Sequence, residues 1–412
     1  MRPEALLQQP LTLPCGAVLK NRLGKSAMSE ALGTTDNRPK PELAKLYRVW
    51  AQGGTGLVIT GNVMIDRKAL GEPNNVALQD DQDLAALKSW AEAGKENNTH
   101  IWVQLNHPGK QSPKGLNEET VSPSAIPFRQ DMQSFFATPR ELTEAEILQI
   151  IQRFATAAKW VKEAGFTGVQ IHGAHGYLVS QFLSPHHNQR TDQWGGSPEN
   201  RRRFVVEVYK AMRAAVGPEF PVSIKINSAD FQRGGLTEEE AMGTVQLLAD
   251  LGMDLIEISG GTYEAPTMAM GTQKESTRSR EAYFLEFAEK ARAVCKAPLM
   301  VTGGFRTLQG MAAALESGSM DVVGLGRLLA VEPDASNRLL AGKDPVNVIK
   351  PIKTGISLVD NMGLMEVSWY QRQIHRMAKG QQPKPNESAL WSFLNVMAAS
   401  GIKTWKTRRL RA

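Results

Sequence analysis

The fold is decided by the stretch LTEAEILQIIQRFATAAKWVKEAGFTGVQIH, residues 142–172. Thr143 and Glu146 have the spacing of a capping box, in which two side chains satisfy backbone N–H groups at the start of a helix. Apolar residues then recur on one helical face, at Ile147, Ile150, Ile151, Phe154 and Val161. Gly165 ends the helix, because glycine readily adopts the left-handed conformation found there. Residues 169–172 follow as an apolar strand, so the stretch predicts a helix that leads directly into a buried strand.

The same order of helix, glycine and apolar strand occurs at residues 42–61, 236–259 and 307–327. Strands that are apolar throughout are typical of a parallel sheet covered by helices. Eight strands are predicted in all, at residues 23–27, 57–60, 101–105, 169–172, 222–226, 255–259, 299–302 and 322–325. This alternation predicts an α/β fold, a (β/α)8 TIM barrel. A doubly wound sheet is the rival, but it favours a GxGxxG turn after an early strand, and the sequence has none.

Additional segments flank the predicted barrel. Residues 11–22, LTLPCGAVLKNR, predict a short hairpin that caps the barrel floor. From about residue 345 onward we expect a mostly helical extension, which divides the chain into a barrel at 1–345 and an extension at 346–412. The extension ends in a basic tail with Lys403, Lys406, Arg408, Arg409 and Arg411. Two interpretations of this tail stay open: a helix packed on the barrel or on a neighbouring subunit of a homo-oligomer, or a segment that binds an anionic membrane surface.

Composition excludes several classes of protein. Five of the six net positive charges lie in the basic tail, and no basic stripe interleaved with aromatic residues occurs elsewhere, so nucleic acid is not expected as a partner. The two cysteines, Cys15 and Cys295, are too few for a disulfide scaffold, a four-cysteine zinc site or a cysteine-ligated iron–sulfur cluster. The sequence shows no signal peptide and no long apolar run, so we expect a soluble, cytoplasmic protein.

In a barrel of this kind the active site lies at the carboxyl ends of the strands. The residues at these predicted ends are mostly small or polar, and they include Ser26, Ala27, Met28, Ser29, Gly61, Gln104, His172, His175, Lys225, Gly303, Gly304, Gly326 and Arg327. Loops after the last two strands of such barrels often bind phosphate through backbone N–H groups. Their glycines let an anion approach the backbone and Arg327 adds a bidentate donor, so we predict a phosphate site there.

His172 and His175 lie at the end of a predicted strand. A metal site needs a third ligand beside them, but there is no HExxH motif and no nearby thiolate, and His186 and His187 fall in a predicted loop. Core packing is a second alternative. We favour two imidazole donors directed at one substrate oxygen, with Tyr177 as a proton donor in the same pocket.

Lys225 at the end of another strand leaves two interpretations open. Its amine could form a Schiff base, as in barrel aldolases, or it could supply a fixed positive charge beside an anionic cofactor. Nothing in the neighbouring sequence separates these two roles.

The stretch HGAHGYLVSQFLSPHHNQRTDQWGGSPENRRRF, residues 172–204, resembles the central motif of the old yellow enzymes. These are the FMN-dependent ene-reductases of the NADH:flavin oxidoreductase group. The segments LKNRLGKSAMS, GLVITG, VQLNHPGKQ, VTGGF and VVGLGR also match, in the family's order, so the resemblance covers roughly residues 10 to 335.

The resemblance implies a non-covalent FMN at the carboxyl end of the barrel. The backbone of Ser26, Ala27 and Met28 is then expected to touch the flavin, and Ser29 to face its C4 carbonyl. Gly61 and Gln104 match residues that contact the pyrimidine edge of the ring. Lys225 matches a cation near N1 that favours the reduced, negatively charged flavin. Gly303, Gly304, Gly326 and Arg327 match the FMN phosphate site.

The resemblance also implies the chemistry. His172 and His175 match the pair that binds the carbonyl or nitro oxygen of an activated alkene, and Tyr177 matches the tyrosine that protonates the α-carbon. NAD(P)H is the implied reductant. This chain has Ser29 where many members have Thr or Cys, which we expect to tune the flavin potential. It has Ala31 where some members place a tyrosine, which is expected to leave that pocket wall open.

Two other classes of function remain as hypotheses. A metal- or lysine-dependent barrel hydrolase or lyase would use His172, His175 and Lys225 and would be colourless. A flavin-binding sensor or scaffold would bind FMN but turn over no enone with NAD(P)H. The dienoyl-CoA reductase subgroup is not expected, because this sequence lacks that subgroup's cysteine cluster after the barrel.

Overall fold

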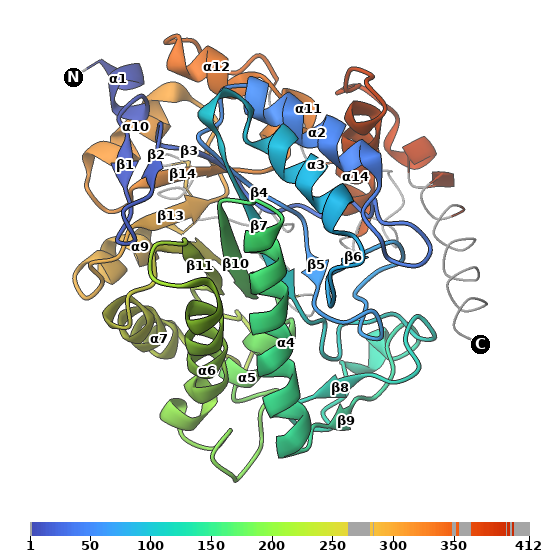
Figure 1. The fold of residues 1–412 in the computed structure, drawn as a ribbon. Coiled ribbons are helices and arrows are strands. Elements are labelled where there is room, and N and C mark those ends of the chain that lie inside the picture. Colours follow the sequence, from blue (N-terminus) through green and yellow to red (C-terminus); the bar gives the residue numbers. More distant parts are fainter. Residues whose placement is uncertain are drawn as a thin grey trace.

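Eight parallel strands form a closed barrel at the centre of the computed structural model (Figure 1). The structure describes residues 2–262, 281–282, 284–347, 352–353, 364–392, 394–395 and 398. The barrel strands are β3 (Leu23–Lys25), β4 (Leu57–Ile59), β7 (His100–Asn106), β10 (Gly168–Gly173), β11 (Val222–Asn227), β12 (Leu255–Ser259), β13 (Leu299–Thr302) and β14 (Val322–Leu325). Their order follows the chain, and pairing of β10 with β7 closes the ring. The predicted (β/α)8 barrel is therefore confirmed.

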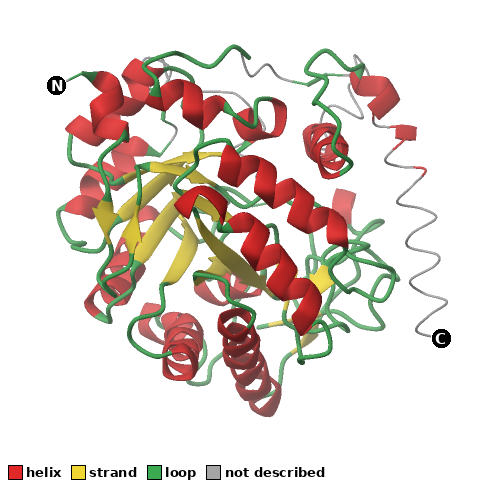
Figure 2. Cartoon of the chain, turned by 45° about the horizontal axis from the view of Figure 1, so that its top comes forward, coloured by secondary structure: helices red, strands yellow, loops and turns green. Residues whose placement is uncertain are grey.

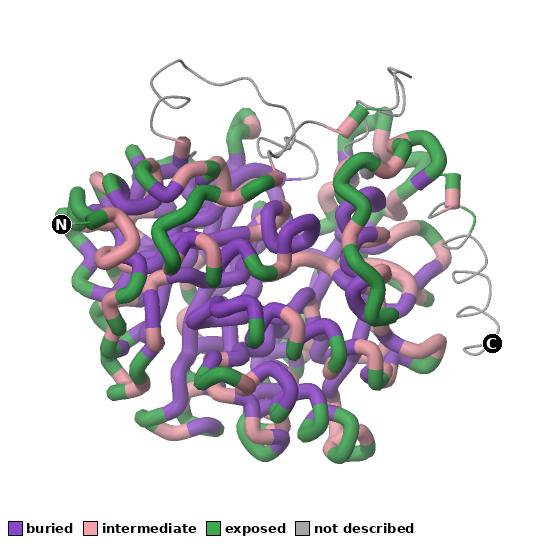
Figure 3. Tube along the Cα trace, turned by 90° about the horizontal axis from the view of Figure 1, so that it is seen from above, coloured by how far each residue is buried: buried purple, intermediate pink, exposed green. Residues whose placement is uncertain are grey.

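Helices surround the strands on the outside (Figures 1 and 2). The long ones are α2 (Pro41–Gln52), α3 (Leu84–Gly94), α4 (Glu144–Glu163), α6 (Pro198–Val216), α7 (Glu238–Asp250), α9 (Leu285–Arg292), α10 (Leu308–Glu316) and α14 (Leu364–Ala378). Shorter helices are α1 (Pro3–Leu7), η1 (Glu96–Asn98), η2 (Gln130–Met132), α5 (Leu178–Leu183), α11 (Arg327–Val331) and α12 (Ala335–Leu340). Buried segments gather at the centre of the molecule and exposed ones at its periphery (Figure 3).

The helix α4 begins and ends as its sequence predicts. The Glu146 N–H donates to Thr143 Oγ1 over 3.3 Å, and the Thr143 N–H donates to Glu146 Oε2 over 2.8 Å, which completes the capping box. Loss of such a cap costs about 0.5–2 kcal/mol of stability. Gly165 has φ 84°, so glycine is required where the chain turns towards β10. A threonine hydroxyl also caps α7, where Thr237 Oγ1 accepts from the Glu240 N–H.

The barrel floor is closed by the predicted hairpin. Its strands β1 (Leu11–Thr12) and β2 (Val18–Leu19) pair antiparallel. Leu13 and Leu19 are buried in one cluster with barrel side chains at or near the amino ends of the strands, including Leu57, Leu255 and Val322. Each fully buried leucine contributes about 1.5–3 kcal/mol of transfer free energy. The floor is therefore closed by an apolar plug.

Several elements extend the carboxyl end of the barrel. The sequence pattern did not predict the short strands β5 (Val63–Met64), which pairs with β7, and β6 (Val76–Ala77), which pairs with β5. The long loop after β7 contains the parallel pair β8 (Val121–Ser122) and β9 (Arg140–Glu141). The helix α14 packs on α2 and α11 (Figure 1). The basic tail, from Lys403 to Arg411, lies outside the described residues, and the division of the chain at residue 345 stays a prediction.

Among the described residues, no helix is both long and apolar enough to cross a bilayer.

Candidate active site

Three aromatic rings meet at the carboxyl end of β10. His172 lies in β10, His175 follows in the next turn, and Tyr177 immediately precedes α5. The ring centroids of His172 and His175 are 5.3 Å apart at 85°, and those of His172 and Tyr177 are 4.7 Å apart at 61°. His172 and Tyr177 are buried, at 3% and 7% exposure. The structure thus brings together the three residues for which the sequence predicts catalysis.

His175 is held in an unusual backbone conformation by neighbouring strands. Its φ is 62°, a left-handed value that costs a residue with a side chain about 1–3 kcal/mol and that persists where the surroundings enforce it. The His175 N–H donates to Asn227 Oδ1 over 3.1 Å, and Nε2 lies 2.8 Å from Ser259 Oγ. Asn227 in turn donates to Gly261 O and Asp230 Oδ1. Asn227 is a positioning residue that the sequence pattern gave no reason to select.

Hydrogen bonds indicate which nitrogen of His172 carries its proton. The Ala174 N–H donates to His172 Nδ1 over 3.4 Å, so Nδ1 acts as an acceptor. In a neutral imidazole the proton then resides on Nε2, which is a donor. For His175, the bond to Ser259 involves Nε2, so Nδ1 is the nitrogen that can act on a ligand.

Both imidazoles are neutral at physiological pH. Burial, then the neighbouring His175 and Lys225, hold the pKa of His172 well below its usual value. Burial and then Lys225 lower the pKa of His175 to about 3, against a smaller opposing effect of Glu257. Each neutral ring carries one N–H group and brings no positive charge of its own into the site.

A connected set of polar side chains, here called the polar belt, crosses the barrel interior beside these rings. Its members are Ser26, Gln104, Gln170, Lys225, Glu257 and Thr302, all of them buried. Gln104 Nε2 donates to Gln170 Oε1 over 2.8 Å, and Gln170 Nε2 donates to Glu257 Oε2 over 2.9 Å. Thr302 Oγ1 donates to Glu257 Oε1 over 2.7 Å and lies 2.8 Å from Ser26 Oγ. Burial at this depth requires such partners, because an unsatisfied polar group inside a protein costs about 1–3 kcal/mol.

Lys225 forms an ion pair within the belt. Its Nζ lies 3.0 Å from Glu257 Oε1, and the two side chains are 4% and 0% exposed. Burial alone would raise the pKa of Glu257, but the charge of Lys225 and hydrogen bonds from Thr302, Lys225 and Gln170 outweigh it and hold that pKa below its usual value. Glu257 is therefore ionised. It was not among the residues selected from the sequence, because those lie at the predicted ends of the strands.

One feature of this region fits the pyrimidine edge of a flavin. Gln104 Oε1 is buried and accepts no hydrogen bond from the described part of the chain, so it can accept one from a ring N–H group. Gly61 is closely surrounded, because a Cβ there would lie 2.4 Å from Met28 O. The Gly61 N–H itself donates to Glu30 Oε1 over 2.9 Å, so its own contact with a ligand stays a prediction.

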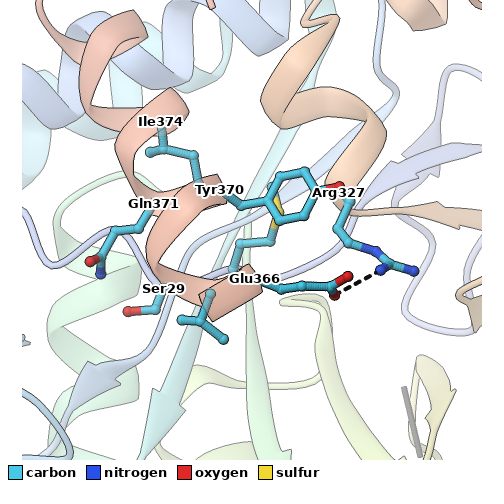
Figure 4. A pocket seen from close by; sticks show the side chains of 8 residues that line it. Ser29, Arg327, Glu366, Tyr370, Gln371 and Ile374 are labelled. Atoms are coloured by element: carbon cyan, nitrogen blue, oxygen red, sulfur yellow. Dashed lines mark hydrogen bonds and ion pairs between the residues drawn. The ribbon is translucent and has the colours of Figure 1, made fainter. Parts of the chain in front are cut away.

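The predicted phosphate residues lie at the ends of β13 and β14. Gly303 and Gly304 have φ values of 109° and 98°, a pair of left-handed conformations that glycine accommodates. Gly326 directly precedes Arg327, the first residue of α11. Arg327 Nη1 lies 3.0 Å from Glu366 Oε2 of α14, an ion pair between the barrel and the C-terminal segment (Figure 4).

A pocket of about 190 Å³ opens beside this ion pair (Figure 4). The barrel side contributes Met28, Ser29 and Arg327, and α14 contributes Glu366, Val367, Tyr370, Gln371 and Ile374. Burial raises the pKa of Tyr370 to about 12, so its phenol keeps its proton at physiological pH. The sequence predicts a mostly helical extension here but gives no sign that one of its helices lines the site, because the partner surface is distant in sequence.

Two departures from the family pattern have a structural context. The Ser29 hydroxyl, expected to face the flavin, donates to the Glu72 carboxylate. Ala31 has φ 47°, and the carbonyl oxygen of its neighbour Glu30 lies 2.5 Å from His375 Nε2 of α14. The wall predicted to be open at Ala31 is therefore approached by the C-terminal helix.

The alternative metal site gains no support. His186 and His187 lie together, with ring centroids 4.7 Å apart, but in the loop after α5. Within the described parts of the chain, no three His, Cys, Asp or Glu side chains are arranged to hold a metal ion.

Comparison with known proteins gives a family match over most of the chain. Residues 7–344 match the model of the "NADH:flavin oxidoreductase / NADH oxidase family". The chain is 39% identical over 351 residues to the NADH-dependent flavin oxidoreductase iliE of Neonectria sp., which covers 79% of this chain but 46% of that protein. It is 38% identical over 352 residues to the NADH-dependent flavin oxidoreductase iccE of Talaromyces variabilis, covering 79% of this chain and 84% of the relative. The chain thus spans about half the length of the first relative and most of the second.

A solved structure agrees with this match. The old yellow enzyme homologue from Zymomonas mobilis superimposes with a TM-score of 0.71 at 26% identity, covering 84% of this chain and 94% of that one.

Proposed function

Because the chain belongs to the NADH:flavin oxidoreductase / NADH oxidase family and is a flavin-dependent oxidoreductase of the old yellow enzyme type, we propose that it reduces the C=C bond of activated alkenes. The substrates in view are α,β-unsaturated carbonyl and nitro compounds. The observation that carries this proposal is the cluster of two neutral imidazoles and a buried phenol at the carboxyl end of β10.

FMN is held without a covalent bond in this proposal. The segment from Ser26 to Ser29, with Gly61 and Gln104, lies along its ring, and Gly303, Gly304, Gly326 and Arg327 bind its phosphate. Lys225 places a positive charge near the ring. When bound, the flavin takes electrons from a nicotinamide and passes them to the alkene.

The two histidines bind the substrate oxygen. His172 donates through Nε2, because its Nδ1 accepts from the Ala174 N–H, and His175 donates through Nδ1, with its Nε2 accepting from the Ser259 hydroxyl. Two N–H donors on one oxygen draw electron density from the C=C bond and stabilise the negative charge that develops on that oxygen, as an oxyanion hole does. The enforced conformation of His175 keeps this donor in place before the substrate arrives, so little reorganisation is needed.

Tyr177 completes the reaction by giving a proton to the α-carbon. A phenol is a competent general acid when it is held within reach of the reacting carbon, and Tyr177 is buried against His172. Its position directly before α5 fixes the side chain on a rigid element.

NADH or NADPH is the proposed reductant. Both fungal relatives described above are named as NADH-dependent. The nicotinamide would use the same face of the flavin as the alkene, so a separate dinucleotide-binding fold is not required.

The visible absorption spectrum tests the proposal. The purified protein should be yellow, lose its colour anaerobically with NADH, and recover it on addition of 2-cyclohexenone. Replacing His172 and His175 together by alanine should abolish the recovery while leaving reduction by NADH. Recovery at the original rate in this double variant would contradict the role of the histidines, and a protein that bleaches but reduces no enone would instead support a sensor or scaffold.

A further inference from the structure

Glu257 is the centre of the polar belt. It lies in the middle of β12 and is fully buried. Its carboxylate accepts hydrogen bonds from Thr302 and Gln170 and pairs with Lys225 at 3.0 Å. These partners come from three other strands, β13, β10 and β11. Three side chains from three strands thus contact one carboxylate, whereas an ion pair alone needs a single partner.

Each partner of Glu257 leads to a residue proposed to contact the flavin. Gln170 orients Gln104 through a 2.8 Å hydrogen bond, and Thr302 bonds to Ser26 at 2.8 Å. Lys225 is itself the proposed cation near the ring. Glu257 therefore connects to three proposed flavin contacts: directly to Lys225, through Gln170 to Gln104, and through Thr302 to Ser26.

The charge of Glu257 has a definite electrical consequence there. Reducing a flavin adds negative charge to its ring, and a nearby Lys225 favours that change. A carboxylate 3.0 Å from the ammonium group offsets this field, because opposite charges at this separation largely cancel at longer range. The barrel interior excludes water, so little screening weakens either effect.

We propose that Glu257 is a positioning residue that holds Lys225 and Gln170 against the flavin and lowers the flavin's reduction potential by compensating the charge of Lys225. This inference rests on the proposed function for the placement of the flavin. A flavin with a lower reduction potential is a stronger reductant once it is reduced. It then passes its electrons more readily to an alkene, so the compensated charge suits an ene-reductase.

The same strand supplies a matched control. Asp254, one residue before β12, is also buried and forms an ion pair with Arg213 at 2.5 Å. It accepts from the N–H groups of Cys15 and Val222, which places it at the floor end of the barrel. Glu257→Gln and Asp254→Asn are the same chemical change, one in the middle of β12 and the other just before the strand begins.

The test is the midpoint potential of the FMN-bound protein at pH 7, measured by equilibration with a reference dye. Glu257→Gln should raise the equilibrium constant for reduction at least tenfold, which is about 30 mV upward for a two-electron couple. Asp254→Asn should leave the potential as in the wild type, although both variants lose stability. A Glu257→Gln potential equal to or below the wild-type value, or an equal rise in both variants, would overturn the proposal.

A second variant covers the case in which Glu257→Gln does not fold. Lys225→Met/Glu257→Gln leaves no unpaired buried charge, and its potential should exceed that of Lys225→Met alone, measured at pH 9 where a lone Glu257 is most ionised. Equal potentials for these two proteins would contradict the proposal. Failure of the proposed function would look different, because the wild type would then bind no FMN or reduce no enone.

Discussion

The two cations proposed to contact the cofactor are paired with carboxylates in very different surroundings. Lys225 and Glu257 occupy adjacent strands at matched register positions, and their side chains are 4% and 0% exposed. Arg327 and Glu366 come from the barrel and from α14, and their side chains are 31% and 18% exposed. The first pair is part of the scaffold, whereas the second depends on a segment beyond the barrel. The comparison teaches that one proposed site can combine two kinds of cation. The partner of Lys225 is supplied by the barrel itself, whereas the partner of Arg327 is supplied by an added helix.

The largest expected effect is on stability at the buried pair. Lys225→Met leaves Glu257 charged and unpaired in the barrel interior, and breaking a buried pair in this way costs about 3–5 kcal/mol. The free energy of unfolding, measured in urea, should fall by that amount at pH 8. The loss should be smaller at pH 5, because an unpaired Glu257 has its pKa raised and escapes its charge by binding a proton. A loss below about 1 kcal/mol at pH 8 would show that the pair is not buried as described.

The partly exposed pair of Arg327 and Glu366 should instead affect the affinity for FMN. Arg327→Gln removes a charged donor from the proposed phosphate site, and a hydrogen bond to a charged group is worth about 1.5–3 kcal/mol, or roughly 10- to 150-fold in affinity. FMN dissociation measured by flavin fluorescence should show this weakening. Because Arg327 is partly exposed, its removal should change stability by less than about 1 kcal/mol. Unchanged FMN affinity would remove Arg327 from the phosphate site.

The histidines beside the buried pair should make the protein sensitive to acid. The pKa of His175 is lowered to about 3 in the folded protein, so the unfolded chain binds more protons between about pH 3 and 6.5. Stability should therefore fall as the pH falls through this window and level off below it. The slope in urea unfolding should be shallower for His175→Asn, and an unchanged slope would contradict the buried, neutral state of this ring.

The smallest expected effect comes from Glu366→Gln. It removes a negative charge next to the proposed phosphate site while keeping a side chain that can accept from Arg327. FMN should bind about two- to fivefold more tightly at low salt, in keeping with the modest energy of a partly exposed pair, and the gain should fade as salt is added. Weaker FMN binding would show that Glu366 serves mainly to hold Arg327 in place. The pair of Arg372 on the same helix and Glu387 beyond its end offers a control, because neither residue lines the pocket.

Much of the fold could be predicted from local patterns. The capping box of α4, its apolar face and the left-handed Gly165 act within a few residues of one another, so their effect is visible in the sequence. The eight barrel strands were found for the same reason. The short strands β5 and β6 were not, because two-residue strands carry no periodicity and form here only where β7, and then β5, offers a partner.

The candidate site was predictable only where it follows the strand ends. His172, His175 and Tyr177 are close in sequence, and the barrel rule places them at one end. Glu257, by contrast, lies inside a strand that the sequence predicts only as a buried apolar strand. Its role in the site depends on the register that places it opposite Lys225. Asn227 and Ser259 acquire their roles only because β11 and β12 bring them to His175.

The sequence by itself thus determined the barrel, its floor, the family resemblance and the residues at the strand ends, because these depend on local backbone preferences and short motifs. The tertiary structure alone decided the partners of each charge: Glu257 for Lys225, and Glu366 of a distant helix for Arg327. Electrostatic energy depends on distance through space, and positions 39 residues apart along the chain, as in the second pair, give no local sign that they will meet.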